Sequence, residues 1–435
     1  MKKNSEFLKF ILNKSNNLIA NNGITSKFRK YGIEGLEQYG LPTHRRGNEE
    51  WKYTNLNKMT SQSYSSTIPD IDNNKIGKLN KLSLAEHLEI NVINGKLSLP
   101  NNNKNENIQV RSLSNKTLNE NDINFFNSLV EKENTEIAYL NTAICEDMIL
   151  LEVKSSSNSP AKCLLNIINT NNNHQAIISS PRIFINVDDS SEFEIIENHI
   201  SLTDENYYTN SVIEILVNNN AKVNHYRILE DSEKSIHTNT TRVNVLENAN
   251  FYSAAFSKGT ELARYDLKVN MPSINSFVEL DGLYFTSGKQ HLDNYINLDH
   301  IAPHCTSRIN YKGILDGQSH AIFGGTVQVR EGAIKTDSLQ SDKNLVLSPK
   351  AEIDSKPSLF IYVDDILAGH GATAGNIDEK TVYYMRSRGL DLETASKMLI
   401  SGFAMEIISK VEIQALSEYL IERYIDTLPS YKFDF

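Results

Sequence analysis

Alternating apolar and polar positions dominate the middle of the chain. Runs in which every second residue is β-branched include Ile183/Ile185/Val187, Ile213/Ile215/Val217, Val243/Val245 and Ile361/Val363. A period of two is typical of β-strands. Asn, Asp, Gly, Ser and Pro residues separate the runs, and no helical pattern of about 10 to 15 residues intervenes, which disfavours a βαβ architecture.

A loose internal repeat connects these runs. An apolar residue is followed by three turn-like positions, a small residue and often, two positions later, another apolar residue. The copies span Val187 to Phe193, Val217 to Val223, Val245 to Phe251 and Leu347 to Ile353, and Val329 to Ala333 starts in the same way. A strand, a tight corner and a second strand predict a β-solenoid. The copies are irregularly spaced, so a β-sandwich remains an alternative.

Both ends of the chain carry helical patterns instead. Apolar residues recur at helical spacing from Ser5 to about Tyr39, and the following stretch to about Asn127 is polar and asparagine-rich, which predicts loops. We therefore predict a mainly β protein in three parts: a helical and loop-rich region at 1–130, a β core at 131–376 and a helical region at 377–435.

Capping residues mark the C-terminal helices. A helix is expected from Glu379 to Arg388, with Gly389 as its left-handed cap, and Asp391 is placed to cap the next helix. The apolar ridge of that second helix advances by four residues each time: Ala395, Leu399, Phe403, Ile407 and Val411. Such a ridge needs a core or a partner.

Composition narrows the classes of function. The chain has 435 residues and a formal net charge of −10. This charge argues against a general nucleic-acid binder, because phosphate contacts need clustered Lys and Arg. Three cysteines without a CxxC pair favour a reducing compartment, and the early apolar stretch is a poor signal peptide or membrane span. We expect a cytoplasmic protein without membrane insertion.

Several groups of residues carry candidate chemistry, each with a plainer interpretation. The residues His291, Asp293, His300, His304 and Cys305 could form a metal site, although alternation along strands would separate them. His225 and His237, near Arg227, are expected as surface histidines. Cys145 and Cys163 are expected as buried, inert thiols.

Motifs for nucleotide binding and for hydrolysis are missing from the sequence. No G-x-x-x-x-G-K-[ST], no G-x-G-x-x-G after a strand and no G-x-S-x-G occurs. We therefore expect no ATP site and no enzyme activity. An acidic series could bind calcium and sugar acids, or simply protect strand edges: Glu279, Asp281, Asp316, Asp337, Asp342, Asp354, Asp364 and Asp365.

His370 is the remaining candidate. It lies in Gly369-His370-Gly371-Ala372-Thr373, where the predicted β region ends and the predicted helices begin. The flanking glycines expose the imidazole and permit unusual backbone angles, so that a metal or another chain could approach. Taken alone, a single histidine of this kind is more often structural or merely exposed.

An ordered series of motifs resembles the SufB/SufD family of iron–sulfur cluster assembly scaffolds, and its SufD side most closely. The motifs are Tyr311–Gly317, Lys335–Leu345, Glu352–Pro357, Gly369–Thr373 and Tyr384–Gly389, with Glu50–Thr54 near the N-terminus. The resemblance implies a right-handed parallel β-helix between helical ends. It also implies a complex in which the chain pairs with a SufB-like scaffold and binds a SufC-like ABC ATPase through its C-terminal helices.

By the same resemblance, His370 matches the SufD histidine implicated in cluster assembly. The resemblance assigns ATPase docking to about 377–427, including Tyr384, Arg386, Arg388 and Phe403. Many SufD chains have a cysteine two positions before this histidine, where this chain has Ala368. A transient iron–sulfur cluster shared with the SufB-like partner would then take its thiolates from elsewhere.

Two other functions stay open. One is a β-helical carbohydrate-active enzyme, and the other is a SufB-like scaffold that pairs with itself as a homodimer. The residues also leave the participation of a flavin open.

Overall fold

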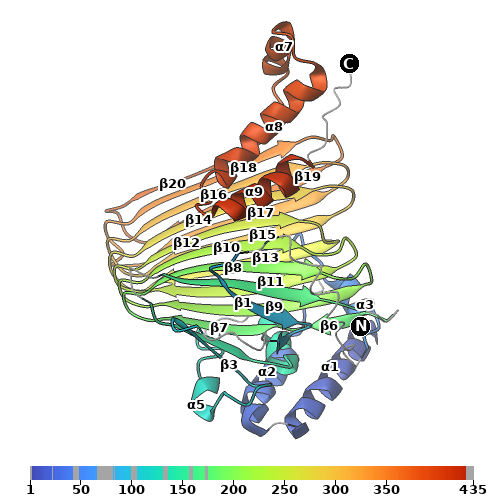
Figure 1. Ribbon diagram of the computed structural model, residues 1–435, viewed down its shortest axis with the longest axis vertical. Coiled ribbons are helices and arrows are strands. Elements are labelled where there is room, and N and C mark those ends of the chain that lie inside the picture. The colour runs from blue at the N-terminus through green and yellow to red at the C-terminus, as the bar shows by residue number, and fades with distance from the viewer. Residues whose placement is uncertain are drawn as a thin grey trace.

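The computed structural model is mainly β, with helices at both ends of a long stack of strands (Figure 1). It describes residues 2–21, 23–42, 49–65, 82, 84–98, 105–130, 136–155, 160–171 and 175–427. The helices are α1 (Lys2–Asn21), α2 (Ser26–Tyr39), α3 (Asn57–Ser61), α5 (Glu120–Ile123), α6 (Glu136–Ile144), α7 (Glu379–Ser387), α8 (Leu392–Ile408) and α9 (Gln414–Leu420), with short turns η1 (Gly23–Thr25), η2 (Glu49–Trp51) and η3 (Ile421–Ile425).

The strands form two sheets that alternate along the chain. Sheet 1 has the order β2 (Lys96–Ser98), β1 (Leu88–Ile93), β5 (Ala161–Asn169), β8 (Glu192–Ser201), β10 (Lys222–Glu230), β12 (Asn250–Lys258), β14 (Phe277–Thr286), β16 (Thr306–Leu315), β18 (Asp337–Val346) and β20 (Leu367–Gly375). Sheet 2 has the order β19 (Glu352–Ile361), β17 (His320–Val329), β15 (His291–His300), β13 (Leu262–Met271), β11 (Ile236–Val245), β9 (Tyr207–Val217), β7 (Arg182–Val187), β4 (Ile149–Val153) and β3 (Ile108–Ser112), and β6 (Ile177–Ser179) also pairs with β9. From β7 onward successive strands change sheets, and neighbours from β4 and β5 onward are parallel, which confirms the predicted β-solenoid.

The register explains why the repeat looks irregular in sequence. Phe193, Val223, Phe251, Val278, Ser307, Ser338 and Ala368 lie side by side along sheet 1, at intervals of 27 to 31 residues. The strands keep nearly constant length, and the connections absorb the difference. The predicted corners are present. Asn220 and Asn248 turn two of them with positive φ, and Asn275 does the same at a further corner. These three asparagines also hydrogen-bond to one another through their side-chain amides, one per turn.

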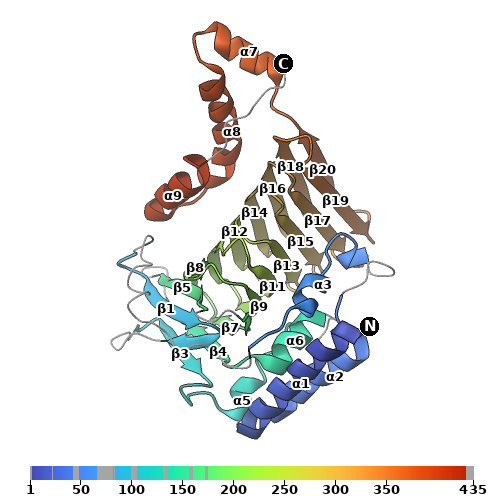
Figure 2. The same cartoon turned by 90° about the vertical axis from the view of Figure 1, so that its right-hand side faces the viewer.

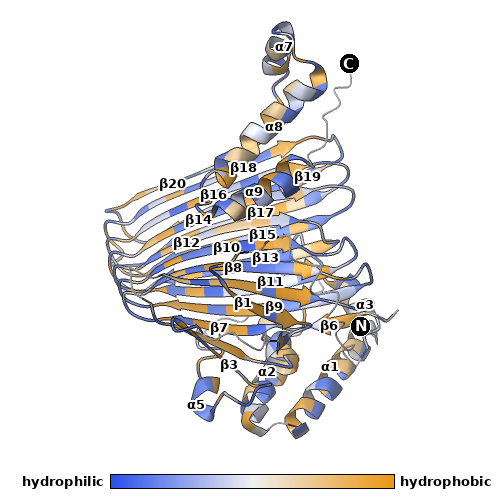
Figure 3. Ribbon diagram, viewed as in Figure 1, coloured by the Kyte–Doolittle hydropathy of each residue, from blue (hydrophilic) through white to orange (hydrophobic). Residues whose placement is uncertain are grey.

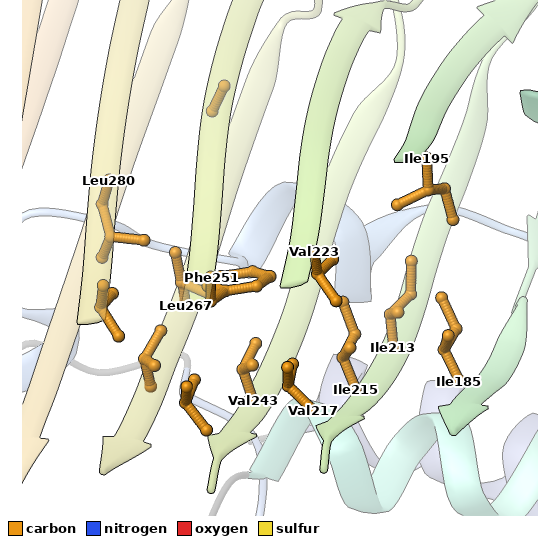
Figure 4. Close-up of a cluster of buried hydrophobic side chains, with 14 of the residues drawn as sticks. Ile185, Ile195, Ile213, Ile215, Val217, Val223, Val243, Phe251, Leu267 and Leu280 are labelled. Atoms are coloured by element: carbon orange, nitrogen blue, oxygen red, sulfur yellow. The ribbon is translucent and has the colours of Figure 1, made fainter. Parts of the chain in front are cut away.

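The apolar core lies between the two sheets (Figure 4). Val217 and Val243 point inward from sheet 2, and Val223 and Phe251 point inward from sheet 1. Alternation therefore places every second residue of a strand in this interior. At about 25 cal/mol per Å², burial of each such side chain contributes roughly 1.5–3 kcal/mol.

One stretch of the interior is polar. The side chains of Glu197, His225 and Arg227 are all buried there, and Glu197 binds the imidazoles of His225 (2.9 Å) and His199 (2.5 Å). His237 is buried as well, with its Nδ1 atom 2.8 Å from Asp231. The expectation that His225 and His237 are surface histidines is therefore wrong. Alternation tells which residues share a face, but both faces of these strands are covered.

The N-terminal part covers the outer face of sheet 2 (Figure 2). Helices α1 and α6 pack there with Trp51, Ile178 and Tyr208. Trp51 lies over Arg264, whose guanidinium carbon is 4.1 Å from the ring centroid, and Arg264 forms an ion pair with Asp293. Strands β1, β2 and β3 lie within the stretch that the sequence indicates as loops, and they extend both sheets. Their pairing with later strands, as in Leu88 with Cys163, is a long-range contact that a weak local pattern does not reveal.

The C-terminal helices cover the outer face of sheet 1. Helices α8 and α9 pack over strands β10, β12, β14 and β16, while α7 projects beyond the last strands (Figures 1 and 2). The predicted caps are confirmed: Asp391 accepts a hydrogen bond from the Thr394 amide, and Gly389 has φ +98°. The buried side of α8 differs partly from the predicted ridge, since Ile400 and Ala404 are fully buried while Phe403 is half-buried.

Ion pairs join these helices to the sheet. Lys410 Nζ lies 2.9 Å from Asp281 and 2.8 Å from Glu279, and Arg423 lies 3.0 Å from Glu230. Hydropathy coloring shows the apolar segments of the strands crossing the body in bands (Figure 3).

Within the described ranges, no helix combines the length and apolar character that a membrane span requires.

Candidate functional site

The solenoid ends at an open edge, formed by β19 and β20. Strand β20 pairs with β18, and β19 pairs with β17; among the described residues, no further strand joins their outer edges. Large apolar side chains are exposed around this end: Leu339, Phe360, Ile361, Tyr362 and Leu367, the last being 71% exposed. We call this set, with β19 and β20, the open edge. Unpaired strand edges with exposed apolar side chains are the usual place for another chain to add.

His370 lies in the middle of the open edge. It is exposed, as expected, but it occupies regular strand β20, and neither Gly369 nor Gly371 has positive φ. The two glycines therefore do not use the unusual backbone angles that they permit. Gly371 borders open space on the other face of the strand, because no atom lies within 4 Å of a Cβ built on it.

Below His370, the interior ends in polar side chains. Gln340 is the partner of His370 in the register between β18 and β20, and it is buried with Asp342. Burial raises the pKa of the Asp342 carboxyl to about 6, although hydrogen bonds donated by Ser355 (2.6 Å) and Asn344 (2.7 Å) act to lower it. The sequence interpretation did not single out Gln340. Only the alternation along β18 could have indicated it, by placing Gln340 on the same face as Asp342.

The chain has no accessible thiol among its described residues at this edge. Ala368 occupies the position two residues before His370, and Cys145, Cys163 and Cys305 are all buried. Burial raises the pKa of both the Cys145 and the Cys163 thiol, which agrees with the expectation of inert thiols. A metal ion at the open edge could thus receive imidazole nitrogen from this chain, and thiolate only from another molecule.

The four residues expected to dock a partner lie on α7 and α8. Tyr384, Arg386 and Arg388 are exposed on or just after α7, and the Arg388 guanidinium carbon lies 5.2 Å from the Tyr384 ring centroid. Phe403 faces the solenoid instead: its ring is 4.4 Å from Lys312 Nζ, and its carbonyl accepts a hydrogen bond from that amine. Residues Tyr383 and Met398 are further exposed large side chains on these helices.

The other candidate groups do not converge. His291 lies 2.9 Å from Thr54, His300 lies 2.9 Å from Ser307, and Cys305 is buried near Ser276. Across the described residues, no three His, Cys, Asp or Glu side chains are grouped so as to hold a metal ion. The acidic series is likewise dispersed, with several members bound to basic residues: Asp281 to Lys410, Asp337 to Arg308, Asp354 to His320 and Asp365 to Lys335.

Comparison with known proteins identifies two family regions. Residues 167–403 match the SufBD core domain of the SUF system for FeS cluster assembly, and residues 1–159 match the N-terminal region of SufBD proteins. The chain is 30% identical to the iron–sulfur cluster assembly protein SufD of Escherichia coli, over 57% of this chain and 59% of that protein. It is 34% identical to protein ABCI7, chloroplastic, of Arabidopsis thaliana, over 54% of this chain and 50% of that protein.

These matched segments span 59% of the Escherichia coli protein and 50% of the Arabidopsis thaliana protein. The core match alone covers more than half of this chain, and it contains the solenoid from the end of β5 to β20 and most of α8. The chain therefore belongs to the SufBD family of iron–sulfur cluster assembly proteins.

Proposed function

We propose that this chain is the SufD-like subunit of a scaffold complex that assembles iron–sulfur clusters. It pairs with a SufB-like subunit through the open edge, and it docks a SufC-like ABC ATPase through α7 and the outer part of α8. The observation that carries the proposal is His370 at the centre of the open edge. A second solenoid placed there would bury Phe360 and Leu367 and would enclose the imidazole at the interface.

The role of the chain in this complex is that of a scaffold rather than an enzyme. The cluster is cargo that is held transiently, with His370 as one ligand and the thiolates supplied by the SufB-like partner. The three buried cysteines support this division, because a thiol must be reachable and deprotonated to bind iron. Free thiols also support a reducing, cytoplasmic location.

Docking of the ATPase is supported by the shape of the C-terminal region. Helix α7 stands away from the solenoid and exposes Tyr383, Tyr384 and Arg386, whereas α9 is packed against sheet 1. An aromatic and basic surface of this kind is typical of protein interfaces. Tyr384, Arg386 and Arg388 are therefore our candidates for direct contact, and Phe403 would support α8 from below.

The test is co-expression of the full chain with SufB-like and SufC-like partners. We expect the three to co-purify, and we expect His370→Ala to leave the complex intact while lowering its cluster content. His304→Asn, at another exposed histidine, is the matched control. Failure to co-purify, or full cluster content with His370→Ala, would overturn the proposal. A dimer of the isolated chain carrying a cluster would indicate the self-pairing scaffold instead.

A further inference from the structure

Gln340 is an unusual residue for the interior of this solenoid. Its side chain is 3% exposed, and neither its amide nitrogen nor its amide oxygen has a hydrogen-bond partner. A buried amide in this state costs free energy, so its presence needs a reason other than stability. The position is also shaped around it: a Cβ on Gly325, in the opposite sheet, would collide with the Gln340 amide nitrogen.

The register places Gln340 directly beside His370 in the ladder. Residues 340 and 370 are partners in the parallel ladder between β18 and β20, so their side chains leave the same face of sheet 1. Strands in such a ladder are about 4.8 Å apart, which lets an amide and an imidazole in register reach each other by side-chain rotation. The residues on either side, Leu339 and Ser341, leave the opposite face.

We propose that Gln340 is a positioning residue for His370, with its amide oxygen accepting a hydrogen bond from one ring N–H of the imidazole. That contact fixes which nitrogen carries the proton, and it leaves the other nitrogen free to bind iron. Gln340 itself does not touch the iron. This inference rests on the proposed function, and it assigns a role that makes use of the unpaired amide.

The contact between Gln340 and His370 becomes important when a second solenoid covers the open edge. In the uncovered chain, water can hydrogen-bond to either nitrogen of the exposed imidazole. Once a second solenoid covers the edge, water is excluded, and the ring nitrogen that does not face iron would lose its partner. Gln340 then supplies the partner from the neighbouring strand, on the same face of sheet 1.

The experiment measures cluster content in the complete complex, by absorbance per complex after reconstitution with ferrous iron and sulfide. Gln340→Met keeps the length of the side chain and removes both polar atoms. We expect it to lower cluster content about tenfold, as is common when the partner of a metal-binding histidine is removed. Gln340→Glu keeps an oxygen acceptor, and we expect this variant to retain most of the wild-type cluster content. Ser341→Ala, on the outer face of the same strand, is the control and should match the wild type.

Two further measurements separate positioning from a structural role. The denaturation midpoint of Gln340→Met should be unchanged or higher, because no hydrogen bond is lost. The double variant His370→Ala/Gln340→Met should be no worse than His370→Ala alone, because Gln340 acts through His370. Normal cluster content in Gln340→Met, an equal loss in Ser341→Ala, or additive losses in the double variant would overturn the inference.

These outcomes also separate this inference from the proposed function. Reduced content in His370→Ala together with normal content in Gln340→Met would refute only the role of Gln340. Normal content in both variants would remove the role of His370 itself.

Discussion

The indole of Trp51 lies against the guanidinium group of Arg264, 213 positions away in sequence, with the guanidinium carbon 4.1 Å from the ring centroid. The guanidinium carbon of Arg264 also lies 4.5 Å from the ring centroid of Tyr295, and its charge is balanced by Asp293. Thr54 also donates a hydrogen bond to Asp293. The segment around Trp51 is thus fastened to the outer face of sheet 2, and it ties the N-terminal region to the solenoid.

Replacement of Trp51 should therefore weaken the whole protein. Trp51→Ala removes a buried aromatic ring, and we expect the free energy of unfolding to fall by about 3 kcal/mol. Urea denaturation followed by circular dichroism measures the change. Lys52→Ala, at the adjacent exposed position, is the control and should change stability by less than about 0.5 kcal/mol. Equal stability of the two variants would show that the indole does not fasten the segment.

Acid should destabilise the fold through His300. Burial lowers the pKa of this imidazole to about 4, below its usual 6.5, so the folded state holds it neutral. As the pH falls from 7 to 5, the unfolded state gains the proton and the folded state does not, which costs about 2 kcal/mol of stability. The variant His300→Gln cannot titrate, and it should lose about 2 kcal/mol less over this range. The same dependence on pH in both proteins would contradict a neutral, buried His300.

Lys410 should hold the C-terminal helices on the solenoid. Lys410→Met leaves the fully buried Asp281 carboxylate without its cation, and we expect a loss of about 1–2 kcal/mol, since Lys410 itself is 39% exposed. Adding Asp281→Asn removes the unpaired charge, so the double variant should recover part of that loss in a double-mutant cycle. Lys397→Met, which breaks only an exposed pair with Glu393, serves as the control.

The open edge and α7 should be separable by mutation. Leu367→Asp with Phe360→Asp places charge on the exposed apolar edge, and it should weaken pairing with the SufB-like subunit about tenfold or more while leaving ATPase docking intact. Tyr384→Ala with Arg386→Glu on α7 should have the reverse effect. Both are measured by co-purification and by binding of each purified partner. Loss of both partners in either variant would contradict two separate surfaces.

Gln340→Met should stabilise the isolated chain. The substitution replaces a buried amide that has no partner with an apolar side chain of similar length, and we expect a gain of about 1 kcal/mol in the free energy of unfolding. Denaturation with urea checks the sign. A clear loss of stability would indicate that the amide is satisfied in solution, for example by bound water.

Much of the fold can be predicted from local patterns. The β-solenoid and its corners follow from alternation and from turn residues such as Asn220, and the ends of α7 and α8 follow from Gly389 and Asp391. Strands β1 to β3 were missed because their sequences are short and polar at their borders. The boundaries at residues 130 and 376, and the role of each site residue, remain predictions.

The candidate site was predicted only in part. The small residues around His370 indicate that its side chain is exposed. They do not indicate that it lies in a regular strand. Gln340 carries no local signal, because a glutamine in a polar strand is ordinary until the register puts it under His370. Alternation along β10 puts His225 and Arg227 on one face, but it does not show that this face is the interior.

What the sequence by itself determined is local: which residues alternate, where the chain turns and where helices are capped. These properties depend on neighbours within a few positions, through backbone sterics and hydrogen bonding. The tertiary structure alone decided which face of each strand is enclosed, that β19 and β20 are left as an open edge, and that Trp51 meets Arg264. Those relationships arise when the two sheets pack against each other. Packing brings together residues that are far apart in sequence, and no local sequence pattern records such contacts.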